Sequence, residues 1–249
     1  MGNRLDNIIS SLVESVRKVL VEYRVTPEEF RAGIGYLVEA AEAKELPLLI
    51  DVFFNITVAE ISNMDSDASP TELQGPYFRE DAPLVTDEIP TDPRFKGTPM
   101  LLRGKVTDTK GEPVAGAEIF IWQSTPDGKY SGFHEGVPAG FYRGKLLTGP
   151  DGKYNVRSTL PVPYQIKNDG PVGALLEKMG RHSWRPAHVH YKIRKPGFKE
   201  VTTQAYFEGG EWVGDDCCGG SVNPELVIPN RTVGDARLVE FDFRIDRAG

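Results

Sequence analysis

The segment LLRGKVTDTKGEPVAGAEIFIWQ (residues 101–123) decides the fold class of this chain. Its apolar and polar residues alternate on both sides of a Lys110-Gly111 turn, as they do in two short strands joined by a turn. The segments KLLTGPDGKYNVRST (145–159) and VEFDFRID (239–246) have the same texture, the first around an Asp151-Gly152 turn. Short strands with regular turns are typical of an antiparallel β-sandwich, and we expect one over residues 91–249.

Residues 1–90 predict an N-terminal region of helices that ends in a linker. TPEEF (26–30) is typical of a helix start, because its threonine and second glutamate can form a capping box around a proline at the first helical position. LPLLIDVFFNITVAEI (46–61) predicts a third, more buried helix, and residues 63–96 lack periodicity, as functional connections and linkers do. The first helix is predicted by apolar residues at every third or fourth position, which are Leu5, Ile8, Ile9, Leu12, Val13, Val16 and Val19.

The composition narrows the classes of partner and compartment. A formal net charge of -7 over 249 residues argues against nucleic acid or an anionic membrane surface as the main partner. No apolar run approaches the length of a bilayer span, and the N-terminus lacks the apolar core of a cleavable signal, so we expect the cytoplasm. The only two cysteines, Cys217 and Cys218, are adjacent and cannot form the usual long-range disulfide, which agrees with a reducing compartment.

Two of the four histidines stand one residue apart in RPAHVH (185–190). If this stretch is a strand, His188 and His190 point to one face and Val189 points to the other, so the two imidazoles can converge on one ion. For an isolated pair of this spacing, a surface or core role is the favoured interpretation. Pro186 fixes the local backbone and Arg185 places a permanent positive charge nearby, and both features favour a binding site for a metal and an anion.

Two tyrosines are the candidate partners of the histidine pair. Tyr130 follows an Asp-Gly turn, and Tyr164 stands 24 residues before His188 (188 − 164 = 24). A phenolate is a hard anionic donor that suits a ferric ion better than zinc, and metal binding would hold it ionised far below its usual pKa of about 10. Judged alone, the two tyrosines are interpreted as core or turn residues, because tyrosine after an Asp-Gly turn is common in strands.

Several motifs together resemble the intradiol ring-cleavage dioxygenases, and within that family the chlorocatechol 1,2-dioxygenase branch. The resemblance covers nearly the whole chain. It rests on the Tyr, Tyr, His-x-His spacing and on QGPYF (74–78), WQSTPDGKYSG (122–132), TLPVPYQI (159–166), GRHSWRPAHVHYKIRKPGF (180–198), VTTQAYFEGG (201–210) and DDCC (215–218).

The resemblance implies a site for one non-haem Fe(III) per subunit. Its ligands would be Tyr130, Tyr164, His188 and His190, with Arg185 and Gln204 beside the bound substrate. The substrate pocket would contain Leu48, Asp51, Val52, Gly75, Tyr77 and Cys218. Two positions depart from the branch, Gln123 where a histidine is usual and Lys167 where a proline is usual, and neither is a ligand position.

The resemblance also implies the reaction and the assembly. A catechol would be opened by O₂ between its two hydroxyl groups to cis,cis-muconate or a chloro derivative, with Tyr164 accepting a substrate proton and Arg185 stabilising charge on the ring. The apolar stripe of the first helix is wider than a lone sandwich needs. We therefore expect a homodimer through the N-terminal helices, with a phospholipid as a possible bound component of the interface.

Three other functions are compatible with parts of the sequence. Catechol and hydroxyquinol 1,2-dioxygenases share the motifs, and the pocket residues alone do not separate them from a chlorocatechol enzyme. A transthyretin-like binding module would have the same sandwich without chemistry. A zinc hydrolase is the weakest alternative, because no general-base carboxylate accompanies the histidines.

The cysteine pair is interpreted as two small buried hydrophobes rather than as a redox switch.

Overall fold

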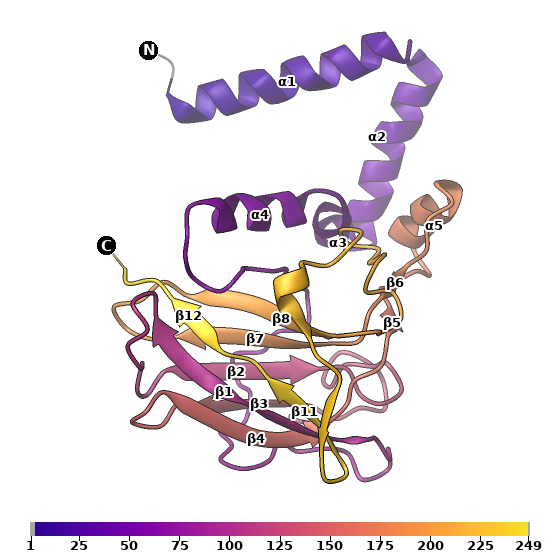
Figure 1. Ribbon diagram of the computed structural model, residues 1–249. Coiled ribbons are helices and arrows are strands. Elements are labelled where there is room, and N and C mark those ends of the chain that lie inside the picture. The colour runs from indigo at the N-terminus through magenta and orange to yellow at the C-terminus, as the bar shows by residue number, and fades with distance from the viewer. Residues whose placement is uncertain (1–2, 249) are drawn as a thin grey trace. The chain divides into compact units, whose positions relative to one another are not determined.

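A computed structural model describes residues 3–248 of the chain (Figure 1). The chain divides into two compact units, Met1–Leu46 and Pro47–Gly249. The predicted boundary between residues 90 and 91 lies inside the second unit and stays a prediction.

The first unit consists of α1 (Arg4–Glu22) and α2 (Pro27–Glu42). α2 begins with the predicted capping box, in which the Glu29 N–H donates to Thr26 Oγ1 (3.2 Å) and the Thr26 N–H donates to the Glu29 carboxylate (2.8 Å). The predicted apolar stripe of α1 is exposed along its whole length, with Leu5 at 65% and Leu12 at 58%. Because a helix gains most of its stability in proteins by burying such a face, a surface that covered the stripe would stabilise α1.

The predicted third helix is confirmed as helical, and it starts at Leu46, the last residue of the first unit. It consists of three pieces, which are α3 (Leu46–Ile50), a π-helical turn (Asp51–Asn55) and α4 (Ile56–Met64). It is more buried than α1 and α2, as predicted: Leu49, Val52 and Ala59 are buried, whereas α1 has no buried residue and α2 has only Ala40. Phe54, Val58 and Ile61 of the same stretch are nevertheless 61%, 59% and 58% exposed.

By length and composition alone, the helical stretch Leu46–Met64 is apolar enough to cross a membrane, and it is the one such helix within residues 3–248. The expectation that no apolar run approaches that length is therefore wrong. A single helix of this kind is weak evidence for a membrane span. Asp51 and Glu60 also place carboxyl groups inside it.

Two five-stranded sheets form the predicted sandwich, and the fold class is confirmed (Figure 1). The first sheet contains β10 (Arg231–Val233), β11 (Ala236–Glu240), β1 (Pro99–Asp108), β12 (Phe243–Ile245) and β4 (Lys153–Thr159). The second contains β3 (Arg143–Leu147), β2 (Glu118–Gln123), β7 (His188–Arg194), β8 (Val201–Phe207) and β9 (Val227–Ile228). Most neighbours are antiparallel, but β1 pairs in parallel with β11 and β12, and β8 with β9.

Four short elements complete the second unit. β5 (Tyr164–Gln165) and β6 (Trp184–Arg185) form a separate two-stranded ladder, and α5 (Pro171–Lys178) lies between them in the sequence. A single 3₁₀ turn, η2 (Pro224–Leu226), precedes β9. The two predicted turns are present, with Gly111 (φ 86°) and Gly152 (φ 75°) in the left-handed region that glycine adopts without strain.

The core lies between the two sheets and uses alternate residues of each strand. In β7, Val189, Tyr191 and Ile193 belong to this core, so His188 and His190 point to the opposite face, as the alternation predicts. The sandwich thus buries one side of β7 and leaves the other side for the site.

Gly104 in the central strand β1 is required by close packing. A Cβ atom at this position would lie 2.1 Å from the Phe241 carbonyl oxygen. We expect Gly104→Ala to lower the free energy of unfolding of the second unit by about 3 kcal/mol, since overpacking of this kind displaces backbone. Thermal or urea unfolding followed by circular dichroism measures the effect. Gly214→Ala is the matched control, because open space surrounds that glycine; equal stability of the two variants would contradict the prediction.

Candidate active site

The two histidines of β7 are brought together by strand register. His190 lies opposite Gln204 of β8 and opposite Trp122 of β2, and His188 lies opposite Tyr206 of β8. The Trp122 and His190 rings stack with a centroid distance of 4.6 Å. The Nε2 atoms of the two histidines are 3.0 Å apart, so both imidazoles point at the same place.

The two predicted tyrosines reach the same place from other elements. Tyr130 comes from the loop that follows β2, and Tyr164 comes from β5, where it pairs with Arg185 of β6. The Tyr130 and Tyr164 rings are 5.2 Å apart by their centroids, and Tyr164 is 5.5 Å from the His188 ring. The Tyr130 ring is 6.3 Å from that of His190. Residues that are distant in sequence thus form one cluster of two phenols and two imidazoles.

The four side chains are buried and their polar atoms are incompletely satisfied. Burial, with the positive charge of Arg185, holds the pKa of His188 well below its usual value, so the ring is neutral. His188 donates from Nδ1 to the Pro186 carbonyl oxygen (2.7 Å), so Nε2, which faces His190, is the unprotonated nitrogen of the ring. Burial and the neighbouring Tyr164 raise the pKa of Tyr130, whose hydroxyl has no hydrogen-bond partner among the described residues.

This donor set fits a hard, highly charged cation. A buried hydroxyl without a partner is costly, and a cation at the centre of the cluster would supply the partner that Tyr130 lacks. The cation would also reverse the pKa shift of the phenols, because it stabilises their ionised form. Two phenolate oxygens with two neutral imidazole nitrogens suit ferric iron.

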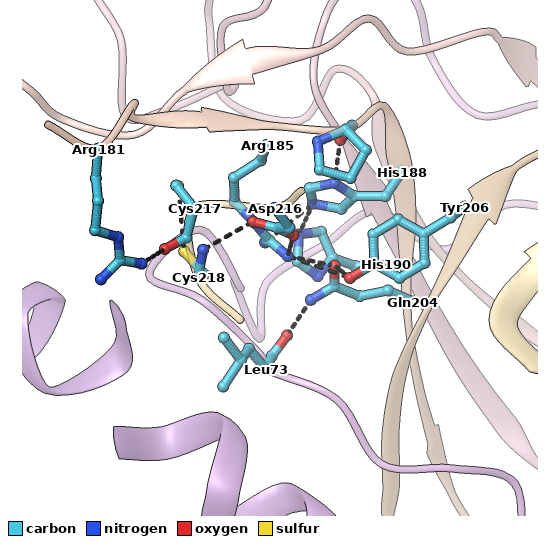
Figure 2. Close-up of polar contacts among 11 residues, drawn as sticks. Leu73, Arg181, Arg185, His188, His190, Gln204, Tyr206, Asp216, Cys217 and Cys218 are labelled. Carbon is cyan, nitrogen blue, oxygen red and sulfur yellow. Dashed lines mark hydrogen bonds and ion pairs between the residues drawn. The ribbon is translucent and has the colours of Figure 1, made fainter. Parts of the chain in front are cut away.

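A buried guanidinium lies beside the cluster. Arg185, 4% exposed, donates from Nη2 to Gln204 Oε1 (3.1 Å), Tyr206 Oη (3.2 Å) and Asp216 Oδ2 (2.8 Å) (Figure 2). Its Nη1 lies 3.4 Å from His188 Nε2. Burial disfavours the charged form, but Asp216 and the nearby phenols hold the pKa of Arg185 above its usual value. The site therefore keeps a permanent positive charge next to the candidate metal position.

Gln204 is fixed by the same network. Its Nε2 donates to the Leu73 carbonyl oxygen (2.5 Å), and its Oε1 also accepts from the Tyr206 hydroxyl (2.8 Å). The structure thus places the two residues that were expected beside the substrate, Arg185 and Gln204, in contact with each other. Tyr206 and Asp216 were not expected there. Two-residue alternation from Gln204 indicates Tyr206, and only the DDCC motif draws attention to Asp216.

Two of the expected pocket residues adjoin the cluster. Tyr77 stacks on Tyr130 with a centroid distance of 4.1 Å, and a Cβ atom on Gly75 would lie 3.9 Å from His190 Cε1. Gly75 has a φ of 66°, so a side chain there would be strained as well as close to the histidine. The buried Arg143 donates to the Tyr77 carbonyl oxygen (2.9 Å) and holds this part of the connection in place.

Arg185 also lines a cavity of about 340 Å³ in the second unit. Its other lining residues include Glu72, Tyr206, Asp216 and Cys218. Both cysteines are free and buried, with Sγ atoms 3.7 Å apart, and of the two only Cys218 lines the cavity. Cys218, one of the expected pocket residues, and the guanidinium of Arg185 therefore line the same cavity.

The other expected pocket residues lie on the first helical segment of the second unit. Leu48 belongs to α3, and Asp51 and Val52 belong to the π-helical turn. Val52 is buried, whereas Leu48 and Asp51 are half-buried. None of the three lines the 340 Å³ cavity. Their role in substrate binding stays a prediction.

The two positions that depart from the family pattern are Gln123, which is in the core of the sandwich, and Lys167, which is at the surface. Gln123 is buried and donates from Nε2 to the Thr159 carbonyl oxygen, so it links β2 of one sheet to β4 of the other. Lys167 pairs with the exposed Asp169 (3.5 Å) at the surface.

Comparison with known proteins agrees with this geometry. Residues 73–247 match the family described as "Dioxygenase", and residues 2–69 match "Catechol dioxygenase N terminus". The chain is 51% identical to chlorocatechol 1,2-dioxygenase of Pseudomonas sp. (strain P51), covering 100% of this chain and 98% of the relative. It is 34% identical to hydroxyquinol 1,2-dioxygenase of Rhizobium sp. (strain MTP-10005), covering 96% and 84%.

A solved structure shows the same fold throughout. The crystal structure of chlorocatechol 1,2-dioxygenase from Pseudomonas putida matches with a TM-score of 0.94 at 49% identity, covering 99% of this chain and 100% of that one. Both family matches, the full-length relatives and the two-tyrosine, two-histidine cluster agree. The chain therefore belongs to the intradiol dioxygenase family.

Proposed function

We propose that this enzyme uses non-haem Fe(III) and O₂ to open catechols between their two hydroxyl groups, with chlorocatechols as the preferred substrates. The observation that carries the proposal is the convergence of two buried phenols and two neutral imidazoles beside a buried guanidinium. The chlorocatechol preference is supported by the 51% identical relative. The product would be cis,cis-muconate or its chloro derivative.

Tyr130, Tyr164, His188 and His190 would hold the iron. When bound, Fe(III) would act as a Lewis acid and as an acceptor of electron density from the catecholate, which would make a ring carbon reactive toward O₂. The protein contributes four fixed donors and a buried environment in which charges interact strongly. Because β-sheet register sets the positions of the histidines, little reorganisation is needed on substrate binding.

Two side chains act directly on the substrate in this proposal. Tyr164, ionised as an iron ligand, would accept a catechol proton at its phenolate oxygen, and Arg185 would stabilise the negative charge that develops on the ring. A preorganised cation in a buried site stabilises such charge more than water does. Gln204 accepts a hydrogen bond from Arg185 Nη2 and would lie next to the substrate.

The substrate pocket would take its walls from three segments. Leu48, Asp51 and Val52 come from the first helical segment of the second unit, Gly75 and Tyr77 come from the long connection, and Cys218 comes from the DDCC motif. Catechol and hydroxyquinol are the alternative substrates, and the 34% identical hydroxyquinol 1,2-dioxygenase shows that the family accepts more than one ring. Initial rates on catechol, 3-chlorocatechol, 4-chlorocatechol and hydroxyquinol decide the ranking.

We further propose a cytoplasmic homodimer that forms through the N-terminal helices, with a phospholipid at its interface. The support is the exposed apolar stripe of α1, together with Phe30 and Ile34 of α2, each 50% exposed. Burial of such a face on a second copy would contribute about 25 cal/mol for each Å² of apolar surface removed from water.

The iron ligands can be tested by visible spectroscopy. The purified protein should be wine-red through charge transfer from phenolate to Fe(III), and anaerobic catechol should move the band to longer wavelength. Tyr164→Phe should shift the resting band and slow catechol binding, because one phenolate is lost. Tyr23→Phe, at a side chain that is 73% exposed, is the matched control. A protein that stays colourless after ferric reconstitution would refute the assignment.

The role of Arg185 can be tested by charge removal. We expect Arg185→Gln to retain iron and colour but to lower kcat by about 10²- to 10³-fold, the usual effect of removing a donor that stabilises transition-state charge. Steady-state rates and iron content measure this. Arg103→Gln is the control, because that arginine forms an exposed ion pair with Glu240. Unchanged turnover in Arg185→Gln would remove the proposed role.

The dimer can be tested by light scattering at micromolar concentration. The wild-type protein should have twice the mass of the chain, and Leu12→Glu should produce monomers, because it places a charge in the apolar stripe. Ser11→Glu, at the neighbouring exposed position of α1, should leave the dimer intact. A monomeric wild-type protein would overturn the proposal, and lipid extraction with mass spectrometry tests the phospholipid.

A further inference from the structure

The Asp216 carboxylate is the main partner of Arg185. It is 4% exposed, and both of its oxygens accept from Arg185 Nε at 3.1 Å, while Oδ2 also accepts from Nη2 at 2.8 Å. This is a bidentate pair, which fixes the plane of a guanidinium as well as its position. Figure 2 shows the carboxylate between Arg185 and the two cysteines.

Asp216 is itself held from several directions. The Cys218 N–H donates to Oδ1 (2.9 Å), the Asp216 N–H donates to the Gly220 carbonyl oxygen (2.6 Å), and the Gly220 N–H donates back (2.7 Å). The next residue is bound to β6, because the Cys217 N–H donates to the Trp184 carbonyl oxygen (3.0 Å). Because these hydrogen bonds hold the Asp216 carboxylate in one position, the carboxylate can hold the guanidinium of Arg185 in one orientation.

The other contacts of Arg185 do not fix its orientation. Gln204 and Tyr206 both accept from the single nitrogen Nη2, so the guanidinium could swing about that atom if Asp216 were removed. With Nε and Nη2 held by Asp216, Nη1 is the nitrogen that faces the cluster, 3.4 Å from His188 Nε2.

We propose that Asp216 is a positioning residue, which holds the guanidinium of Arg185 so that Nη1 faces the substrate position beside the metal cluster. Asp216, Cys217 and Cys218 also lie close enough together to hold a metal ion. Arg185 already binds both carboxylate oxygens, which is why the role of Asp216 is assigned toward Arg185. This inference rests on the proposed dioxygenase function.

The first test replaces the carboxylate by its neutral isostere. In Asp216→Asn, iron content, the resting visible band and the anaerobic affinity for catechol should stay within about twofold, because the ligands are untouched. kcat should fall about 10- to 100-fold, since misplacement of a reacting group by about 1 Å has an effect of that order. Asp215→Asn is the matched control, because this adjacent carboxylate is 74% exposed and pairs with His182 (3.3 Å).

The second test is a double-mutant cycle with Arg185→Gln, which keeps the inference testable if Asp216→Asn fails to fold. The double variant buries no unpaired charge. If Asp216 acts through Arg185, the double variant has the kcat of Arg185→Gln alone within about twofold, because coupled residues are not additive. A further loss of tenfold or more would show that Asp216 acts independently and would overturn the inference.

Failure of the inference is distinguishable from failure of the proposed function. A wild-type protein that is active on catechols, with Asp216→Asn at wild-type kcat, overturns only the role of Asp216. The same holds if Asp216→Asn weakens anaerobic catechol binding but leaves kcat unchanged. A wild-type protein without iron colour and without catechol turnover overturns the proposed function itself.

Discussion

The two-faced strand β7 is the constraint on which the rest of the structure depends. Its odd-numbered residues, Val189, Tyr191 and Ile193, are fully buried in the sandwich core, and the core cannot accept any other register. That burial fixes His188 and His190 on the opposite face to within the tolerance of a β-ladder. Burial of the apolar residues of β7 has no directional preference of its own, but through the alternation of the strand it fixes the direction of two nitrogen donors.

The polar side of the strand has a stability cost. Neutral histidines, phenols of raised pKa and an ion pair between Arg185 and Asp216 are all buried, and a buried ion pair often gains little net stability over apolar residues of similar size. The sandwich supports these groups through its large core on the other face. The Tyr130 hydroxyl, which has no hydrogen-bond partner among the described residues, is the kind of buried oxygen that a bound cation would satisfy.

Local patterns in the sequence were sufficient for the local elements. Capping by Thr26 and Glu29, the glycine turns and the alternation around Val189 each depend on neighbours in sequence, and the structure has them as predicted. The parallel pairings of β1 and the π-helical turn depend on partners far away in the chain, so no short pattern contains them. For the same reason the sequence did not predict a role for Asp216, because its partner Arg185 lies 31 residues away.

The short ladder between β5 and β6 has a consequence for how such an enzyme changes over evolution. Tyr164 and Arg185 are neighbours by backbone pairing, so their separation is independent of the side chains that surround the substrate. The proposed pocket walls come instead from a helical segment, from the connection that holds Gly75 and Tyr77, and from Cys218, all outside both sheets. Substitutions in the walls can therefore accumulate without moving the reactive groups. A lineage with this division can acquire a new ring specificity through a few changes while its chemistry is inherited intact.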